Sequence, residues 1–402
     1  MADLTFEDIL EAQQTVRGNI KRTPLSHSAT FSKMTGCDVY IKYENFQKAG
    51  SFKIRGAYNK IAHLAEKQRQ KGVVAVSTGN HAQGVALAAS LFGIPATIVM
   101  PKGAPIPKIE ATKGYGGQVV LYGTTFEEAF TRAREIEEEE GKTLIHAFDD
   151  QYIAAGQGTI GLEILEDLPD VDVVIAPIGG GGLLAGIATA IKAKNPDCRI
   201  VGVQAREMDA AYRSFKEGTL VKTEKGRTIA DGIAIKSPSD FTFSVLKSQL
   251  HDIVTVEEEE IANAILLLLE RCKTIAEGAG AVSLAALLYR KIAKAGEKVV
   301  LVVSGGNIDS TMLGKIITQG LIKAGRYREI RVLVEDKPGG LAALVETISK
   351  AEANIIDMGF DRYSLDVPFN CVLVDLALET KSKAHSEEVV EELRKKHEVR
   401  SN

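Results

Sequence analysis

Short apolar runs alternate with longer segments of helical periodicity along most of the chain. Runs rich in valine and isoleucine are typical of strands buried on both faces, and most are followed by apolar residues at helical spacing. This alternation predicts an α/β fold with parallel sheets covered by helices on both faces. The predicted strands are 38–43, 73–76, 96–100, 118–122, 144–147, 171–176, 200–203, 253–256 and 299–303.

The predicted elements fall into two series. One series runs from Phe46 to Ala147 and the other from Asp150 to Ala324. Two such units predict two lobes with a cleft between them, and we assign residues 1–45 and 149–325 to a large lobe and residues 46–148 to a small lobe. The predicted helices are 5–17, 151–167, 183–194, 257–273 and 281–295, with others beginning near 58, 80, 107 and 125.

Composition places the chain among globular proteins of two or three domains. It has 402 residues, a net charge of −4 and 45% hydrophobic residues, which leaves no footprint for nucleic-acid binding. The four cysteines are too scattered for a disulfide framework or a thiolate metal cluster. The acidic amino terminus around Asp3 lacks the basic flank of a signal peptide, and the apolar segment 261–269 is too short to cross a bilayer. We expect a cytoplasmic protein without a membrane or nucleic-acid partner.

One lysine stands out in the hexapeptide Ser51–Gly56. Lys53 follows the aromatic Phe52. A free lysine amine titrates near ~10.4 and is a poor nucleophile at neutral pH unless its site favours the uncharged form. Desolvation against Phe52, or condensation with a carbonyl group, could supply that preference. On the hexapeptide alone, a solvated lysine at the start of a helix is the better interpretation, and three further loops change it.

Three special loops follow predicted strands. They are 77–80, 179–182 and 304–307. In open α/β sheets, ligands bind at the carboxyl ends of the strands. The four consecutive glycines at 179–182 allow backbone N–H groups at a helix start to face an anion, which favours a phosphate site over a flexible turn. A dinucleotide site is the rival, but Val203 leads to Gln204 where an acidic partner is needed.

A lysine that forms an imine, a phosphate site and a hydroxyl at a third strand end together describe pyridoxal phosphate. Its aldehyde would condense with Lys53, its phosphate would rest on Gly179–Gly182, and Ser304 would meet its ring nitrogen.

The motifs SFKIRG, STGNHAQG, PIGGGGL, TIADGIA and SGGN resemble those of the threonine and serine dehydratases. These belong to the tryptophan-synthase-β-like class (fold type II) of pyridoxal phosphate enzymes, and the resemblance covers about 6–324. It implies that Lys53 is the Schiff-base lysine and, with Ser304, a catalytic residue. The other implied contacts are Phe52 on the ring, Asn80 on the ring hydroxyl, Gly179, Gly180, Gly181, Gly182 and Leu183 on the phosphate, and Ser77, Thr78, Gly79, Asn80 and His81 on the substrate carboxylate.

This resemblance implies β-elimination of L-threonine, and of L-serine, to 2-oxobutanoate or pyruvate and ammonia. A serine at the ring nitrogen need not keep that nitrogen protonated, which favours rapid loss of the β-hydroxyl over racemisation. Cysteine and threonine synthases place an aspartate where this chain has Ile54. Serine racemases are the closer alternative, although they place a serine where this chain has Thr78.

Other positions have a less defined role. The acidic metal ligands of the racemases correspond to Gln204 and Ala210, so we predict no metal site. Glu277 either lines the cofactor pocket or is a solvated carboxylate at a helix start. We interpret His81, Arg55 and Asp231 as scaffold. A sensor that binds amino acids without catalysis is the non-enzyme alternative, and the intact lysine, serine and glycine loop argue against it.

The tail from about Arg326 changes character. Its predicted order is strand 330–334, helix 341–351, strands 355–363 and 369–378, helix 386–396 and a short strand near Val399. With its Asp-Lys-Pro-Gly turn at 336–339, it resembles an ACT domain, a small α+β module that senses amino acids, over 327–402. The resemblance implies an amino-acid effector, with isoleucine first if the enzyme is biosynthetic, and a homodimer or homotetramer. A dimerisation domain without a ligand is the alternative.

Overall fold

The computed structural model describes residues 4–224 and 226–400. Asp3 and the outermost residues of the predicted large lobe and tail therefore lie outside the described residues. The chain divides into two compact units, one up to Ile308 and one from Asp309. Residues 310–323, which we assigned to the large lobe, belong to the second unit. The boundaries of the two lobes within the first unit stay a prediction.

The helices are bounded as follows. The α-helices are α1 (Phe6–Val16), α2 (Ala29–Thr35), α3 (Lys53–Ala62), α4 (Glu66–Lys71), α5 (Asn80–Leu91), α6 (Ile106–Gly114), α7 (Phe126–Glu140), α8 (Gln151–Asp167), α9 (Gly182–Lys192), α10 (Ala210–Glu217), α11 (Asp240–Gln249), α12 (Glu258–Cys272), α13 (Gly278–Tyr289), α14 (Ser310–Lys323), α15 (Gly340–Lys350) and α16 (Lys383–Arg394). The 3-10 helices are η1 (Glu44–Phe46), η2 (Lys48–Gly50), η3 (Arg206–Met208) and η4 (Asp231–Ile233).

The strands form three sheets. They are β1 (Leu25–His27), β2 (Asp38–Tyr43), β3 (Val73–Val76), β4 (Ala96–Met100), β5 (Gln118–Leu121), β6 (Thr143–Leu144), β7 (Val173–Pro177), β8 (Arg199–Ala205), β9 (Asp252–Val256), β10 (Lys298–Val303), β11 (Tyr327–Glu335), β12 (Asn354–Asp361), β13 (Cys371–Glu379) and β14 (Glu398–Arg400).

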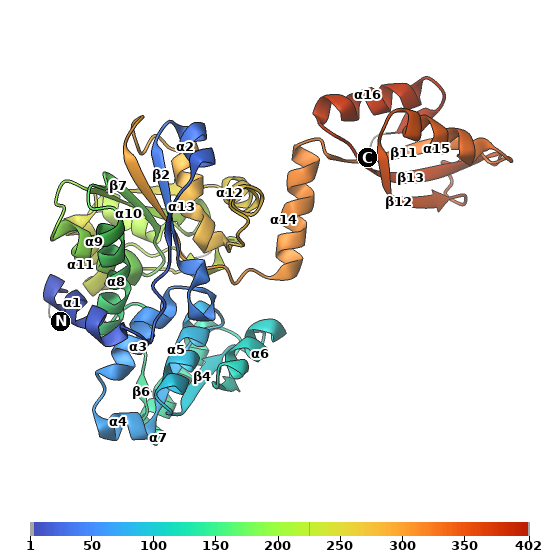
Figure 1. Ribbon diagram of the computed structural model, residues 1–402. Coiled ribbons are helices and arrows are strands. Elements are labelled where there is room, and N and C mark those ends of the chain that lie inside the picture. The colour runs from blue at the N-terminus through green and yellow to red at the C-terminus, as the bar shows by residue number, and fades with distance from the viewer. Residues whose placement is uncertain (1–3, 225, 401–402) are drawn as a thin grey trace. The chain divides into compact units, whose positions relative to one another are not determined.

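The first unit contains two sheets. The larger has the order β1-β2-β10-β7-β8-β9, in which every pair is parallel except β1 with β2. The smaller has the order β5-β4-β3-β6 and is parallel throughout. Figure 1 shows α4 to α7 gathered around the smaller sheet at one end of this unit. The predicted parallel α/β architecture is therefore confirmed.

Several predicted ends differ from the observed ones. The helix predicted at 281–295 is α13, which begins earlier, at Gly278, and ends at Tyr289. It ends there because the backbone of Arg290 is extended and its guanidinium group binds Glu260 of α12. The predicted strand 144–147 is reduced to Thr143–Leu144. The three-residue β1 was not predicted, since it is too short to show a period of two.

Helices α8 and α9 approach each other closely at glycines. A Cβ atom on Gly186 of α9 would lie 2.2 Å from the carbonyl oxygen of Ala154 and 2.5 Å from the amide nitrogen of Gly158, both on α8. Apolar side chains on either side of this contact, including Ile160, Leu184 and Ile187, belong to the main core. The glycines therefore let two buried helices share one layer on the larger sheet.

The second unit contains an antiparallel sheet of order β12-β13-β11-β14. Buried residues alternate along β11 at Ile330, Val332 and Val334, so one face of the sheet packs on α15 and α16. The short strand at 398–400 pairs with β11, with Val399 opposite Val332. The predicted order of strands and helices in the tail is confirmed.

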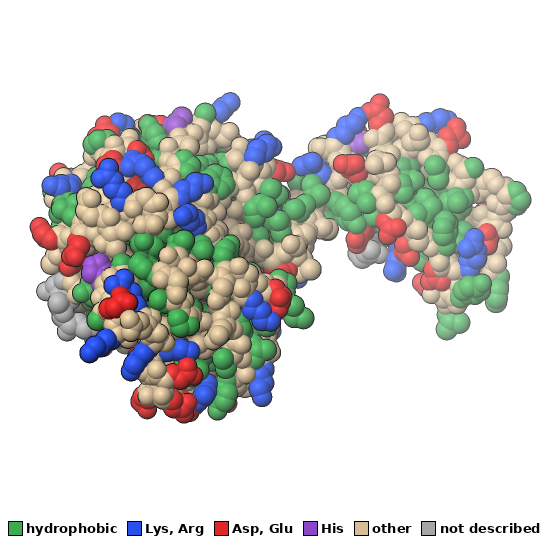
Figure 2. All heavy atoms as spheres, turned by 60° about the horizontal axis from the view of Figure 1, so that its bottom comes forward, with side chains coloured by type: hydrophobic (Ala, Val, Ile, Leu, Met, Phe, Trp, Pro, Cys, Tyr) green, Lys and Arg blue, Asp and Glu red, His purple; other side chains and the backbone are tan. Residues whose placement is uncertain are grey.

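The charged side chains at the surface, the cysteines and the lengths of the helices can be compared with the expectations from the sequence. The face drawn in Figure 2 mixes basic and acidic side chains, with neither sign covering a large area. All four cysteines are free thiols. None of the described helices combines the length and the apolar character needed to span a membrane.

The contact between α8 and α9 gives a stability prediction. Gly186→Ala should lower the free energy of unfolding by about 1–3 kcal/mol, because the new methyl group meets backbone atoms that cannot move aside. The matched control is Gly114→Ala at the end of α6, where nothing lies within 4 Å of the added atom. It should be neutral or stabilising by less than about 1 kcal/mol. Equal urea midpoints for the two variants would contradict the close contact.

Candidate active site

The three loops singled out in the sequence meet at one pocket in the first unit. They follow β3 of the smaller sheet and β7 and β10 of the larger sheet. The pocket is lined by Phe52, Lys53, Asn80, Ala147, Phe148, Pro177, Gly179, Gly180, Gly181, Gly182, Leu183, Gly232, Ile233, Ile235, Glu277, Ala279 and Ser304. The structure thus brings together the predicted lysine, glycine loop and serine, which lie far apart in the sequence.

Lys53 is the first residue of α3 and points into this pocket. Its Nζ atom donates a hydrogen bond to the carbonyl oxygen of Ala147 at 3.3 Å and lies 5.1 Å from the centroid of the Phe52 ring. Burial lowers the pKa of the Lys53 amine to about 8, and the charge of Glu277 opposes this shift only in part. The uncharged, nucleophilic form is therefore accessible near neutral pH.

The lysine is tied to the loop that follows β10. Ser51 forms an isolated β-bridge with Gly305, and the amide N–H of Phe52 donates to the carbonyl oxygen of Ser304 at 3.1 Å. The Ser304 side chain is buried, and its hydroxyl donates to the carbonyl oxygen of Ala279 at 3.3 Å. These contacts hold the Ser304 hydroxyl and the start of α3 on the same wall of the pocket.

The glycine loop forms another wall. Gly181 has φ +97°, a backbone conformation that is strained for any residue with a side chain. It is the N-cap residue of α9, and since it has no side chain it offers no side-chain acceptor to the first N–H groups of the helix. A Cβ atom on Gly180 would lie 2.2 Å from the Phe148 ring. The Thr242 hydroxyl fixes the loop by donating to the Gly180 carbonyl at 2.7 Å. Phe148 and Thr242 were missed in the sequence, since no local pattern signals either contact.

Asn80 lies in a chain of polar contacts. Its Nδ2 atom donates to Glu277 Oε1 at 2.5 Å, and its Oδ1 atom accepts from Asn307 Nδ2 at 2.8 Å. Glu277 is buried and lines the pocket, so the solvated alternative is wrong. Burial, and then the charge of Asp231, raise the pKa of Glu277 to about 7. Asn307 was visible in the SGGN motif but was not named as a site residue.

The loop predicted to hold the substrate carboxylate is only partly at the pocket. Among its described residues Asn80 lines the pocket, whereas Ser77 Oγ accepts from the amide of Gly79 at 3.1 Å. The His81 ring is buried and bonds to the carbonyl oxygen of Ile145 at 2.9 Å. Burial lowers the pKa of His81 to about 3, so its neutral ring gives no positive charge for a carboxylate. A role in substrate binding is left to its backbone.

The described residues contain no group of three histidine, cysteine or acidic side chains placed to hold a metal ion. The Gln204 Oε1 atom accepts from the amide N–H of Tyr212 at 2.8 Å.

The fold and the pocket define a class of α/β proteins in which a buried lysine amine and a glycine loop at the start of a helix line one pocket. A family model described as "Pyridoxal-phosphate dependent enzyme" matches residues 16–305. The chain belongs to this family, and its cofactor is pyridoxal phosphate.

Individual relatives resemble the chain over most of its length. The L-threonine ammonia-lyase of Thermotoga maritima is 50% identical over 386 residues, which cover 96% of each chain. The structure of maize serine racemase superposes with a TM-score of 0.76 and 38% identity, covering 80% of this chain and 99% of the racemase. The processed form of threonine deaminase isoform 2 from Solanum lycopersicum superposes with a TM-score of 0.74 and 38% identity, covering 78% of this chain and 87% of the deaminase.

The residues at the pocket fit this cofactor. Its phosphate needs N–H donors that no side chain obstructs, and a Cβ atom at Gly180 or Gly181 would collide with Phe148 or Thr242. Its aldehyde needs an amine that is uncharged part of the time, which burial of Lys53 provides. When bound, the cofactor withdraws electrons from the Cα atom of an amino acid attached to it.

The buried amine gives a prediction for the cofactor-free protein. The pKa of Lys53 falls from 10.5 to about 8 on folding. The unfolded chain therefore binds more protons between these pH values, and wild-type stability rises with pH across that window. Lys53→Met removes the cost of burying the charge, so it should raise the free energy of unfolding at pH 7 by about 2–3 kcal/mol.

The measurement is urea unfolding of both cofactor-free proteins from pH 7 to pH 10.5. The advantage of the variant should be constant up to about pH 8 and should shrink steadily above it. A difference that stays constant over the whole range would show that the Lys53 amine is not desolvated.

Proposed function

We propose that the protein is a threonine ammonia-lyase, which converts L-threonine to 2-oxobutanoate and ammonia and also acts on L-serine. The observation that carries this proposal is the meeting of Lys53, the glycine loop and Ser304 at one pocket. The full-length relative named L-threonine ammonia-lyase supports the choice of substrate. Four free thiols suit a reducing compartment such as the cytoplasm.

In this proposal each wall of the pocket has one task. Lys53 Nζ would hold the cofactor aldehyde, and the same amine, when free, would be the base that accepts the proton from the substrate Cα. The backbone N–H groups of 179–183 would hold the phosphate, Phe52 would contact the ring, and Asn80 would bond the ring hydroxyl. The neutral hydroxyl of Ser304 would face the ring nitrogen without forcing it to carry a proton, which would favour loss of the β-hydroxyl over racemisation.

Serine racemase is the alternative within the same fold. The similarity to the maize enzyme supports it, but at 38% identity against 50% for the ammonia-lyase. Thr78, where racemases place a serine, still carries a hydroxyl, so chiral analysis of remaining serine is part of the test. A non-catalytic amino-acid sensor would produce neither a keto acid nor D-serine.

The decisive experiment compares wild type with Lys53→Ala. Purified wild-type protein should show the visible absorption of bound pyridoxal phosphate and form a keto acid from L-threonine. Lys53→Ala should lose both, since no other amine among the described lining residues can replace it. Survival of the visible band and of deamination in the variant would refute the proposal.

We further propose that the second unit is an ACT domain that binds an amino-acid effector, with isoleucine the first choice. Its order of strands and helices and the turn at 336–339 support this assignment. Ile356 and Phe360 on β12 are about half exposed, which suits pairing with a second copy in a homodimer or homotetramer. Dimerisation without a ligand is the alternative.

Truncation tests the regulatory part of the proposal. A chain ending at Arg326 should keep turnover of L-threonine and lose its response to isoleucine. The maize racemase, 99% of which is covered by 80% of this chain, suggests that the shortened chain can fold. The control is thermal unfolding with and without isoleucine, where stabilisation should occur in the full chain alone. An unchanged isoleucine response in the truncated protein would contradict the assignment.

A further inference from the structure

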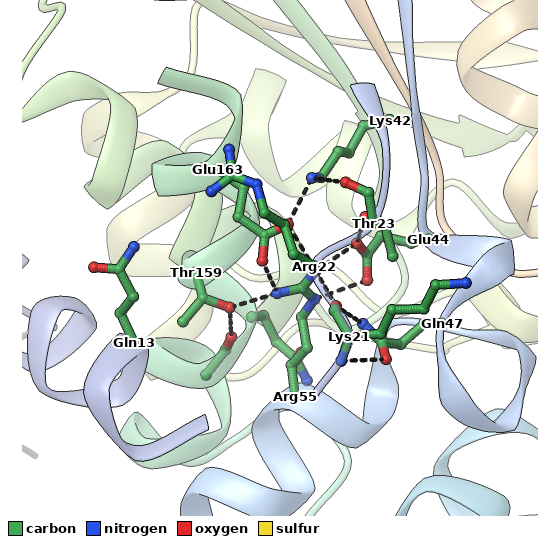
Figure 3. Close-up of polar contacts among 12 residues, drawn as sticks. Gln13, Lys21, Arg22, Thr23, Lys42, Glu44, Gln47, Arg55, Thr159 and Glu163 are labelled. Atoms are coloured by element: carbon green, nitrogen blue, oxygen red, sulfur yellow. Dashed lines mark hydrogen bonds and ion pairs between the residues drawn. The ribbon is translucent and has the colours of Figure 1, made fainter. Parts of the chain in front are cut away.

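A second cluster of charged side chains lies outside the pocket and is buried. Lys42, Glu44 and Arg55 are inaccessible to solvent, and Glu163 is 8% exposed. They come from β2, η1, α3 and α8, and Figure 3 shows them pointing toward one another. None of the four lines the pocket, and the proposed reaction uses none of them.

Arg55 is the centre of this cluster. Its Nε and Nη2 atoms donate to the two carboxylate oxygens of Glu44, each at 2.8 Å. Its Nη1 and Nη2 atoms donate to the two oxygens of Glu163 at 2.6 and 2.9 Å. Nη1 also donates to Thr159 Oγ1 at 3.0 Å. One planar guanidinium group thus holds two carboxylates by two forks, which a lysine cannot do.

Lys42 completes the charge balance from another element. Its Nζ atom donates to Glu163 Oε2 at 2.5 Å and to the carbonyl oxygen of Thr23 at 2.7 Å. Burial lowers the pKa of Lys42, whereas Arg55 stays charged because the two carboxylates outweigh the effect of burial and raise its pKa. Buried ion pairs of this kind contribute little net stability, and fixed geometry is what they can add.

Arg55 lies close to Lys53 along the chain. The two residues are two positions apart in the first turn of α3, and Glu44 stands at the start of the loop that leads to them. That loop contains Ala49 at φ +59°, a strained conformation that persists only where its surroundings hold it. One Arg55 fork joins the two ends of the segment 44–55, because it binds Glu44. The other fork joins the segment to Glu163 of α8.

The anchor on α8 also reaches the pocket. Helix α8 starts three residues after Phe148, and Ala147 accepts the hydrogen bond of Lys53. Next to Arg55, the amide of Gly56 donates to Gln157 of α8 at 3.2 Å, and a Cβ atom on Gly56 would lie 2.6 Å from the carbonyl oxygen of Ile153. A shift of α3 along α8 would therefore move Lys53 relative to its acceptor.

We propose that Arg55 is a positioning residue, which holds the first turn of α3 between Glu44 and Glu163 so that Lys53 Nζ stays at the pocket. This inference rests on the role of Lys53 under the proposed function. A displacement of a reacting group by about 1 Å can lower a rate about 100-fold, and surrounding residues must hold such a group within about 0.5 Å.

The test compares Arg55→Met with the matched control Lys42→Met. Each change removes one buried cation from the same cluster, but Lys42→Met leaves both Arg55 forks in place. Full-length variants are freed of cofactor, and capture of pyridoxal phosphate is followed by growth of the visible band. Thermal midpoints, and kcat and KM for L-threonine, are measured alongside. Arg55→Lys is a third variant, which keeps the charge and loses the forks, in case Arg55→Met does not fold.

Both methionine variants should have lower thermal midpoints. The Arg55 variants should also capture pyridoxal phosphate about 10-fold to 100-fold more slowly and lose kcat by a similar factor, with KM changed less than about 3-fold. Lys42→Met should stay within about 2-fold of wild type in these kinetic values.

Three other results would overturn the inference. If Arg55→Lys captures the cofactor and turns over as wild type does, or if Lys42→Met shares the kinetic defect of the Arg55 variants, the cluster serves stability alone. If wild type itself forms no visible band, the proposed function fails and this inference fails with it.

Discussion

The active pocket depends on taking one lysine amine out of water. Lys53 Nζ lies against Phe52 and meets a carbonyl oxygen, and burial brings its pKa down to about 8. The same removal from water brings the pKa of Glu277 up to about 7. The pKa of the lysine is thus lowered toward 7 and the pKa of the carboxyl group is raised toward 7, so a change of protonation at either group costs little free energy near pH 7. Under the proposed function Lys53 acts first as nucleophile and then as base, and a pKa near the working pH suits both roles.

Backbone contacts make the pocket one mechanical unit. The loop after β10 pairs with Ser51 through Gly305, accepts from the amide of Phe52 through Ser304, and accepts from the amide of Glu277 at 3.1 Å through Gly305. The lysine, the serine and the carboxylate are therefore positioned by the same few peptide groups.

The sequence predicted elements best where burial leaves continuous apolar runs. Strands β2, β3 and β4 and helix α8 have the predicted ends, whereas the end of α13 depends on Arg290 binding Glu260, 30 positions away. The same limit applies at the pocket. Glycines 179–182 are evident in the sequence, but Phe148, whose ring lies where a Cβ of Gly180 would be, belongs to another loop and follows no local pattern.

Two buried lysines show what separates a reactive amine from a structural one. Burial lowers the pKa of both Lys42 and Lys53, so the shift alone does not distinguish them. Lys42 donates to a carboxylate that Arg55 also holds, and its charged form is part of a balanced cluster. Lys53 Nζ donates to a carbonyl oxygen, and the charge of Glu277 offsets the effect of burial on its pKa only in part. Placement of carboxylates, which only the folded chain determines, therefore separates the two lysines, and Lys53 is the one that reacts under the proposed function.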